Sequence, residues 1–211
     1  MKQTKIVILN WNGRKHLERF LPTLVKNTPE AGIVIADNGS TDDSLDFVRS
    51  RFPQIEIVTM EKNYGYAGGY NRALEQVEAD YFLLLNSDVE VPAGWIVPLI
   101  ETLDTHPEVA AVSPKIRSFS EPARFEYAGA AGGFIDCLGY PFCRGRILDS
   151  IEMDEGQYDD ARDVFWASGA CMLVRSEVFR KLGGFDADFF AHMEEIDFCW
   201  RAQLAGYKIR I

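Results

Sequence analysis

Short β-branched runs alternate with amphipathic helical patterns along the first half of the chain, and this alternation limits the fold to one class. The predicted strands are residues 5–9, 32–36, 55–59, 81–85 and 109–113. The predicted helices are residues 15–26, 41–51 and 94–103, together with the helix that closes the glycine-rich segment NYGYAGGYNRALEQV. Strands that alternate with helices form a parallel sheet with crossover helices. We therefore predict an α/β fold, with a Rossmann-like, mostly parallel central sheet flanked by helices.

The second half of the chain lacks this regular alternation. Residues 115–165 mix Gly, Pro, aromatic and charged residues without sustained periodicity, which predicts an extended insertion. A strand over residues 167–174 and helices over residues 176–182 and 194–205 are predicted to follow it. A chain of 211 residues can bury one good-sized core, so we predict a single domain. Its last residues, YKIRI, have the pattern of a strand that is cut off, and we expect a C-terminal truncation.

The overall charge disfavours one class of partner. A formal net charge of -10 argues against nucleic acid, because non-specific binding to the phosphate backbone requires clustered Lys and Arg. The same acidity is compatible with a divalent metal that gathers carboxylates around a polyphosphate. The chain contains no run of about 18 apolar residues and no signal-peptide pattern at its start, so we expect neither a transmembrane segment nor secretion. A cytoplasmic location is the expectation that follows.

Polar residues cluster where three of the predicted strands end. These clusters are Asn10-Trp11-Asn12, Asp37-Asn38-Gly39-Ser40-Thr41-Asp42 and Asn86-Ser87-Asp88. In an open parallel sheet, ligands bind beyond the carboxyl ends of the strands, so we expect a ligand site at this edge. Asp37 either accepts hydrogen bonds from a nucleobase or ribose, or belongs to a turn and helix cap. Asp88 is either a ligand of Mg²⁺ or Mn²⁺ bound to a diphosphate, or a residue of a strand-to-helix turn.

A glycine-rich segment and an arginine follow the third predicted strand. At Gly65, Gly68 and Gly69 a loop could bring backbone amides close to a phosphate, although the glycine spacing is not that of the dinucleotide-binding fingerprint. Arg72, early in the next helix, either pairs with a phosphate or a nucleoside, or lies in solvent. Taken alone, this segment is a weak indication of phosphate binding.

Three carboxylates gather at the start of a C-terminal helix, in the segment HMEEIDFCWR. Glu194, Glu195 and Asp197 are favoured there by the helix dipole even if they take no part in a reaction. The functional interpretation makes one of them the general base that removes a proton from an attacking hydroxyl. We expect His192, beside them, to be an ordinary polar residue whose hydrogen bonds are satisfied.

Five motifs in this order resemble the family 2 glycosyltransferases of GT-A fold, in particular the rhamnosyltransferase-like bacterial members. They are VILNWN, IADNGSTDDS, KNYGYAGGYNRAL, YFLLLNSDVEV and the long segment from SGACMLV to QLAGYKI, which together cover nearly the whole chain. The resemblance implies an inverting transfer of a sugar from a nucleotide diphosphate donor to an acceptor hydroxyl. It also implies a nucleotide-binding half over residues 1–114 and an acceptor-side half over residues 115–211.

The resemblance assigns roles to individual positions. Asp88 matches the last residue of the family's DxD metal motif, whereas the first position is Asn86, which adds no second charge. Glu195 takes the place of the family's catalytic aspartate and is predicted to be the base, with Glu194 and Asp197 in support. The predicted donor-nucleotide site consists of Asn10, Asn12, Asp37, Asn38, Gly65, Arg72, Asn86 and Ser87. The predicted acceptor and donor-sugar pocket consists of Trp166, Gly169 and Ala170.

The implied partners are a nucleotide-diphosphate sugar as donor, Mg²⁺ or Mn²⁺ as cofactor, and a saccharide or lipid-linked saccharide as acceptor. Bacterial cell-surface polysaccharide synthesis is the usual context of the family, and it is compatible with peripheral association at the inner face of the membrane. Two other functions stay open. One is a nucleotidyltransferase, although the first predicted strand ends in NWNGRK rather than in a glycine-rich, basic triphosphate loop. The other is a non-catalytic module that binds a nucleotide or a carbohydrate.

Overall fold

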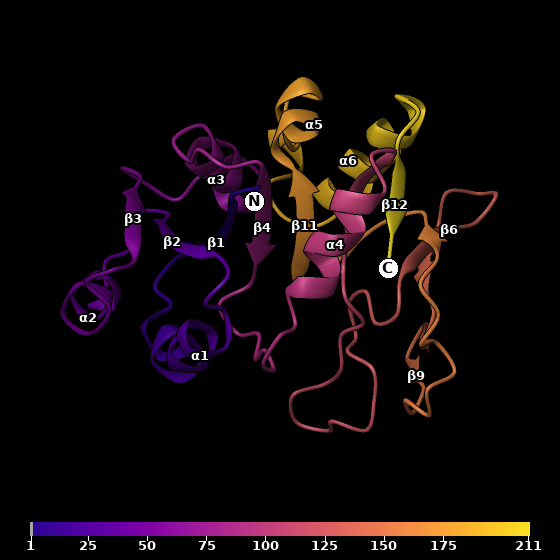
Figure 1. Cartoon of the computed structure of the whole chain (residues 1–211), viewed down its shortest axis with the longest axis horizontal. Helices are drawn as coiled ribbons and strands as arrows, with labels where there is room; N and C mark the ends of the chain where they lie inside the picture. The colour runs from indigo at the N-terminus through magenta and orange to yellow at the C-terminus, as the bar shows by residue number, and fades with distance from the viewer. Residues whose placement is uncertain (1) are drawn as a thin grey trace.

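A sheet of eight strands forms the centre of the protein in the computed structural model, which describes residues 2–211 (Figure 1). In spatial order the strands are β10 (Asp163–Val164), β12 (Lys208–Arg210), β5 (Val109–Val112), β11 (Cys171–Arg175), β4 (Tyr81–Leu85), β1 (Thr4–Asn10), β2 (Gly32–Asp37) and β3 (Glu56–Thr59). β1 to β4 are mutually parallel, and β12 is parallel to β5. β11 is antiparallel to both of its neighbours, and β10 is antiparallel to β12. The prediction of a mostly parallel central sheet is confirmed.

Helices cover both faces of this sheet (Figure 1). The helices of one face are α1 (Arg14–Asn27), α2 (Ser44–Arg51) and α4 (Val97–Thr105). Those of the other face are α3 (Gly65–Leu74), α5 (Ser176–Lys181) and α6 (Glu194–Leu204), with the short 3₁₀ turn η1 (Ala187–Phe189) before α6. Because both faces are covered, β4 is buried throughout, with Leu83 and Leu85 in one apolar cluster and Phe82 and Leu84 in the other.

Hydrophobic periodicity predicted most of the regular elements correctly. The predicted strands agree with β1 to β5 to within one residue at each end. Helix α1 buries Leu17, Phe20, Leu21 and Leu24, the four residues that its sequence pattern places on one face. Within residues 2–211, no helix combines the length and the apolar character that are needed to cross a bilayer.

The prediction of a glycine-rich loop is wrong for Gly68 and Gly69. α3 begins at Gly65, so Gly68 and Gly69 lie inside the helix. The reason is close packing, because a Cβ atom at Gly69 would lie 2.9 Å from side-chain atoms of both Leu9 and Asn38. Glycine thus lets α3 approach the end of β1, and this packing outweighs the low helix propensity of glycine.

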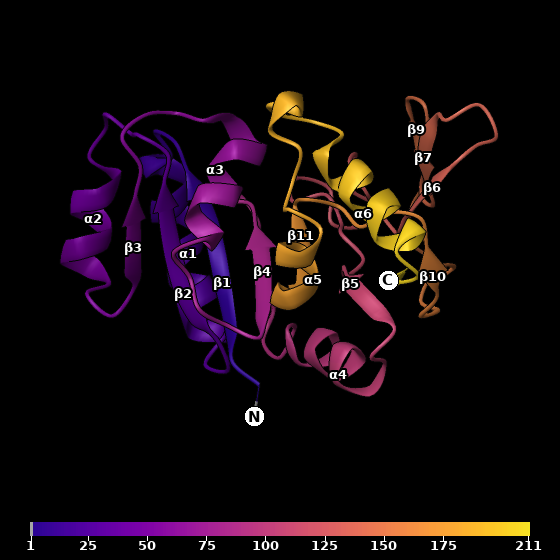
Figure 2. The ribbon, with the colours of Figure 1, turned by 90° about the horizontal axis from the view of Figure 1, so that it is seen from above.

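The irregular insertion predicted after the first half contains a second, smaller sheet. Its strands, in spatial order, are β6 (Gly133–Ile135), β7 (Pro141–Cys143), β8 (Arg146–Ile147) and β9 (Ser150–Ile151), and all are paired antiparallel. These strands are two or three residues long, which is too short for an alternating pattern to stand out in the sequence. Figure 2 shows this small sheet standing apart from the main sheet, beyond α6 as seen from β11.

Candidate active site

The polar clusters predicted at strand ends lie together where the parallel strands of the main sheet end, at its carboxyl edge. Figure 2 shows the arrows of β1 and β4 pointing to the side on which α3 and α6 begin. Asn10 and Asp37 are partners in the parallel register of β1 and β2. Because β11 runs antiparallel to β4, the residues before β11 reach the edge where β4 ends, and the Asn86 N–H donates to the Ala170 carbonyl at 3.0 Å. Segments far apart in the sequence therefore converge at this edge.

Asp37 is held by donors from the protein itself. Its Oδ1 atom accepts a hydrogen bond from the Asn10 side-chain amide at 2.9 Å, and its Oδ2 atom accepts one from the Ser40 backbone N–H at 3.1 Å. The same amide nitrogen lies 3.0 Å from the hydroxyl oxygens of both Ser40 and Ser44, and its two hydrogens are shared among these three neighbours. As a result Asp37 is only 3% exposed. The carboxylate orders the turn after β2, and its lone pairs leave capacity for a further donor.

Neighbouring asparagines fix two more loops at this edge. The Asn12 side-chain oxygen accepts a hydrogen bond from the Thr41 backbone N–H at 2.7 Å. The Asn38 side-chain amide donates to the Gly65 carbonyl at 2.9 Å. Gly65 has a φ of +75°, and a Cβ atom there would lie 2.6 Å from the Phe190 ring. Glycine is therefore required where α3 begins against the segment that precedes α6.

Arg72 is exposed and lies in the last turn of α3, not early in the helix as predicted, because the helix already begins at Gly65. Its guanidinium carbon is 3.8 Å from the centroid of the Tyr64 ring, so the two groups stack. The stacking fixes the direction of the side chain without neutralising its charge. Arg72 thus keeps a positive charge available on the side of the sheet where the strands end.

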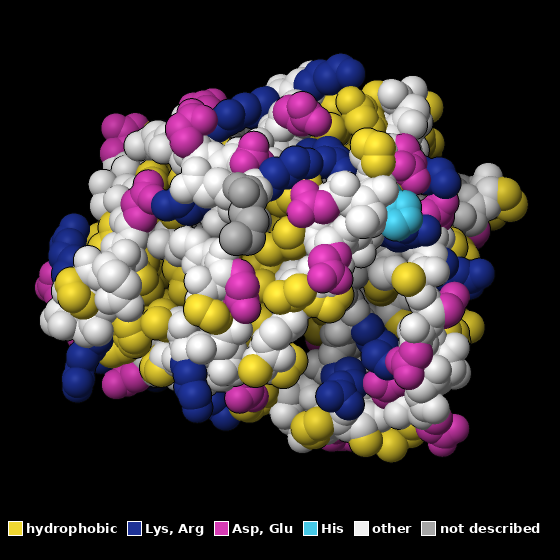
Figure 3. Space-filling view, in the orientation of Figure 1, with side chains coloured by type: hydrophobic (Ala, Val, Ile, Leu, Met, Phe, Trp, Pro, Cys, Tyr) yellow, Lys and Arg dark blue, Asp and Glu magenta, His cyan; other side chains and the backbone are white. Residues whose placement is uncertain are grey.

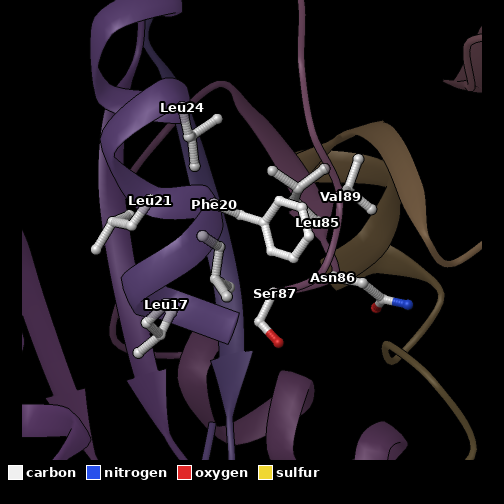
Figure 4. Close-up of a pocket in the computed structure, with 9 residues that line it drawn as sticks. Leu17, Phe20, Leu21, Leu24, Leu85, Asn86, Ser87 and Val89 are labelled. Atoms are coloured by element: carbon white, nitrogen blue, oxygen red, sulfur yellow. The ribbon is translucent and has the colours of Figure 1, made fainter. Parts of the chain in front are cut away.

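The turn after β4 carries Asn86, Ser87 and Asp88. Figure 4 shows the side chains of Asn86 and Ser87 pointing away from Phe20, one of the apolar residues of α1 that pack against the end of β4. The cavity enclosed there has a volume of about 10 Å³, which is room for one water at most, so a ligand must bind outside it. Asp88 is exposed and accessible to such a ligand.

Asp88 and Asn86 fit a partial metal site. Within residues 2–211, no three His, Cys, Asp or Glu side chains are grouped so that they could hold a metal ion by themselves. Mg²⁺ in phosphate-binding enzymes is commonly held by one or two carboxylates, with substrate phosphates and water as the other ligands. An exposed carboxylate and an amide oxygen on one turn match that donor set, and a bound diphosphate would have to complete it.

Tyr66 connects the start of α3 with two segments, the one before β11 and the one before α6. The Gly169 carbonyl accepts a hydrogen bond from the Tyr66 hydroxyl at 2.7 Å, and a Cβ atom at this glycine would lie 2.9 Å from the same hydroxyl oxygen. The Tyr66 N–H donates to the Phe190 carbonyl at 2.7 Å. Sequence reasoning missed Tyr66, whose only signal is an aromatic residue inside a glycine-rich motif. The tyrosine thus holds the start of α3 against Gly169 and Phe190.

Glu194 and Glu195 form a buried pair of carboxyl groups at the start of α6. Burial, followed by the charge of Glu195, raises the pKa of Glu194 to about 7. Burial also raises the pKa of Glu195, while backbone groups, Glu194, and the charge of His192 act in the opposite direction. Each glutamate has a buried Oε2 atom without a hydrogen-bond partner within residues 2–211. Two adjacent buried carboxyl groups do not both ionise readily, so the pair keeps one proton up to about pH 7.

Asp197 does not belong to this pair. Its carboxylate forms an ion pair with Arg201, four residues later on the same helix, at 2.7 Å. Arg201 also donates to the carbonyls of Leu182 and Gly184, at 2.7 and 2.8 Å. Through Arg201, Asp197 holds the turn after α5, and its support of the base stays a prediction.

Trp166 is packed against the small sheet. It is 7% exposed, and its indole N–H donates to the Phe134 carbonyl at 2.9 Å. A Cβ atom at Gly133 would lie 1.9 Å from the indole ring, so one ring face covers that glycine. This ring face is therefore not available to a sugar, although Trp166 does line a groove next to α6.

Comparison with known proteins identifies the family. The chain matches the profile of the family described as Glycosyl transferase family 2 over residues 5–183. An N-acetylglucosaminyl-diphospho-decaprenol L-rhamnosyltransferase of Mycobacterium tuberculosis is 31% identical to it, over 96% of this chain and 71% of that protein. Rhamnosyltransferase WbbL of Escherichia coli is 22% identical, over 97% of this chain and 78% of that protein.

A solved structure of another protein shares this fold. The mannosyltransferase PcManGT from Pyrobaculum calidifontis, in complex with GDP-Man and Mn²⁺, superimposes with a TM-score of 0.68 at 17% identity. The aligned region covers 99% of this chain and 54% of the mannosyltransferase, so this chain spans about half the length of that structure. With the family match over residues 5–183, these findings show that the chain belongs to glycosyl transferase family 2 and is a glycosyltransferase of GT-A fold.

Proposed function

We propose that this protein transfers a sugar from a nucleotide-diphosphate sugar to an acceptor hydroxyl by a single displacement, with Glu195 as the base. The observation that carries the proposal is the Glu194–Glu195 pair, which is buried beside Gly169 at the edge where β4 ends. A pair that keeps one proton leaves one carboxylate free to accept the proton of an attacking hydroxyl. The displacement is inverting, and it needs no covalent enzyme intermediate.

Within the pair, we propose that Glu194 holds the shared proton and that Glu195 carries the charge. Glu194 is the more buried of the two, and the backbone of Gly169 together with His192 favours the charged form of Glu195. As the acceptor oxygen bonds to the anomeric carbon, its proton passes to Glu195 and the bond from that carbon to the diphosphate breaks. The negative charge thereby moves from the carboxylate to the leaving nucleoside diphosphate.

The donor nucleotide is proposed to bind where β1, β2 and β4 end. The proposed donor-site residues are Asn10, Asn12, Asp37, Asn38, Gly65, Arg72, Asn86 and Ser87. The exposed Arg72 guanidinium supports this proposal, because it offers a charge for a phosphate. A divalent metal, Mg²⁺ or Mn²⁺, would be held by Asp88 with Asn86 and would neutralise charge on the diphosphate. The complex of the structurally similar mannosyltransferase with GDP-Man and Mn²⁺ supports this choice of ion.

The acceptor is proposed to be a lipid-linked saccharide that binds in the acceptor-side half, residues 115–211. Residues 1–114 are proposed as the nucleotide-binding half. Support comes from the M. tuberculosis relative, whose name specifies a sugar diphosphate linked to decaprenol. We also propose that the reaction belongs to bacterial cell-surface polysaccharide synthesis and takes place at the inner face of the membrane. Gly169 and Ala170 are proposed to border the pocket in which the two sugars meet.

The role of Glu195 is tested with Glu195→Gln, which keeps the shape of the side chain and removes its ability to take up a proton. Loss of a general base typically lowers the rate by about 10²–10⁴-fold, while donor affinity should change less than about twofold. Transfer is measured with a panel of nucleotide sugars, Mn²⁺, and a synthetic N-acetylglucosaminyl diphosphate lipid, and donor binding is measured by calorimetry. Glu177→Gln, at an exposed position of α5, is the matched control. A Glu195→Gln enzyme that turns over at the wild-type rate rules out this base.

A further inference from the structure

A groove runs between the small sheet and the start of α6. Its volume is about 480 Å³, which lies within the range of roughly 300–1,000 Å³ typical of ligand pockets. Its inner wall includes Trp166 and Ile196, and its outer wall includes Tyr140, Phe142, Ile147 and Leu148. The lining is therefore mainly apolar, with few polar groups among these residues.

The outer wall leaves large apolar side chains in contact with water. Tyr140 is 68% exposed, Ile147 is 67% exposed and Leu148 is 81% exposed. Of the fourteen large hydrophobic residues exposed within residues 2–211, seven belong to the segment that begins at Tyr127 and ends at Met153, both included. Figure 3 shows hydrophobic side chains at the tip of the loop that joins β6 and β7. A concentration of exposed apolar surface on one short segment is typical of a binding surface.

Two residues of the inner wall are close in the sequence to residues of the candidate active site. Ile196 directly follows Glu195 in α6, and Trp166 lies three residues before Gly169. A molecule that fills the groove therefore lies between Ile196 of α6 and the exposed apolar side chains of the outer wall. A long amphipathic molecule suits this shape better than a free sugar does.

One uncompensated positive charge lies in the wall of the groove. Arg146 donates from Nε to the Leu148 carbonyl and from Nη1 to the Tyr127 carbonyl, which fixes the direction of its guanidinium. Within residues 2–211, no carboxylate lies close enough to Arg146 to form an ion pair. The acidic residue of the lining, Asp136, already accepts from the backbone N–H groups of Leu138 and Tyr140. The groove thus holds one positive and one negative side chain, and Arg146, which has no carboxylate partner within residues 2–211, offers its charge to an anionic group such as a phosphate.

We propose that this groove binds the lipid end of the acceptor, with its apolar chain along Tyr140, Phe142, Ile147 and Leu148 and its diphosphate at Arg146. The inference rests on the proposed function, because it assigns a subsite to the lipid-linked acceptor. It also explains why exposed apolar residues gather along this groove, since the acceptor covers them when it binds.

The test measures binding without sugar transfer, so that its outcome does not depend on the proposed chemistry. Undecyl diphosphate and ethyl diphosphate are titrated into the full chain by calorimetry, and the wild type should bind the undecyl probe at least about tenfold more tightly. The double substitution Ile147→Ser with Leu148→Ser should remove most of that difference. Leu204→Ser, at a position of α6 that is 78% exposed and lies outside the groove, is the matched control and should not change it.

Arg146→Gln should weaken the binding of both probes, and Arg146→Lys should restore part of it, because the charge is then present again.

Three results would overturn the proposal. One is equal affinity of the wild type for the two probes, and another is an unchanged chain-length preference in the double variant. The third is a double variant that loses binding to phosphatidylcholine vesicles but keeps its preference for undecyl diphosphate, which would make this face a membrane-docking surface.

Discussion

The buried carboxyl pair makes the stability of the protein depend on pH in a direction that can be worked out. Glu194 is 3% exposed, and its pKa is about 7 in the native state against an ordinary value of 4.5. Between pH 4.5 and about pH 7, the carboxyl group of Glu194 has lost its proton in the unfolded chain but keeps it in the native state. The native state then binds more protons than the unfolded state, so the free energy of unfolding falls as the pH rises. The fall is complete above about pH 7.

Glu194→Gln should remove most of this dependence. A rise in pKa from 4.5 to about 7, at about 1.4 kcal/mol per pKa unit, corresponds to a loss of about 3 kcal/mol between pH 4.5 and pH 7. Glutamine has nearly the same volume, can still donate a hydrogen bond to Glu195, and has no proton to lose. The variant should therefore be the more stable protein at pH 8 and should gain little or nothing at pH 4.5.

The assay is urea-induced unfolding of the wild type and the variant at intervals from pH 4.5 to pH 8.5. The quantity compared is the free energy of unfolding at each pH. Glu177→Gln, which removes a carboxylate from an exposed position of α5, controls for the change in net charge. The reasoning is refuted if Glu194→Gln loses as much stability as the wild type between pH 4.5 and pH 7.

Other predictions concern the metal, the start of α3 and its link to α6. Asp88→Asn should lower donor affinity in the presence of Mn²⁺ by at least about tenfold in calorimetry, since it removes a metal-binding charge; equal wild-type affinity with and without Mn²⁺ would contradict this. Gly65→Ala should destabilise the protein by more than about 1 kcal/mol, because φ is +75° and the added Cβ meets Phe190. Gly94→Ala, with φ +72° and open space around it, measures the backbone cost alone, and equal urea midpoints for the two would refute the contact. Tyr66→Phe should cost about 1–3 kcal/mol in urea unfolding by leaving a carbonyl without its donor, and an unchanged midpoint would argue against that hydrogen bond.

Sequence periodicity predicted the parallel half of the sheet because each of its elements is long enough to repeat its pattern. α1 shows this most clearly, since its four buried residues could be named in advance. The polar clusters at the strand ends could also be expected to share an edge, because parallel strands end on the same side. These inferences need only local patterns and the geometry of a parallel sheet.

The rest of the site depends on contacts that no local pattern encodes. The strand pattern before Arg175 does not reveal that β11 runs antiparallel, yet this direction brings Gly169 and Ala170 to the edge where β4 ends. The sequence predicts a loop through Gly69, whereas the helix already begins at Gly65. The tight packing of Gly69 against β1, which favours this helix, is a tertiary effect. Likewise, Asp197 has the sequence position of a catalytic support, and its pairing with Arg201 is visible only in three dimensions.

The position of β11 also has a consequence for synthesis of the chain. β4 pairs with β1 on one side and with β11 on the other, and β11 begins at Cys171, long after β4 has left the ribosome. Until β11 is made, one edge of β4, whose sequence YFLLL is wholly apolar, lacks a partner strand. Such an unpaired edge is prone to aggregation. A nascent or proteolysed chain that stops short of β11 should therefore need a chaperone to remain dispersed, even though its parallel half is already present.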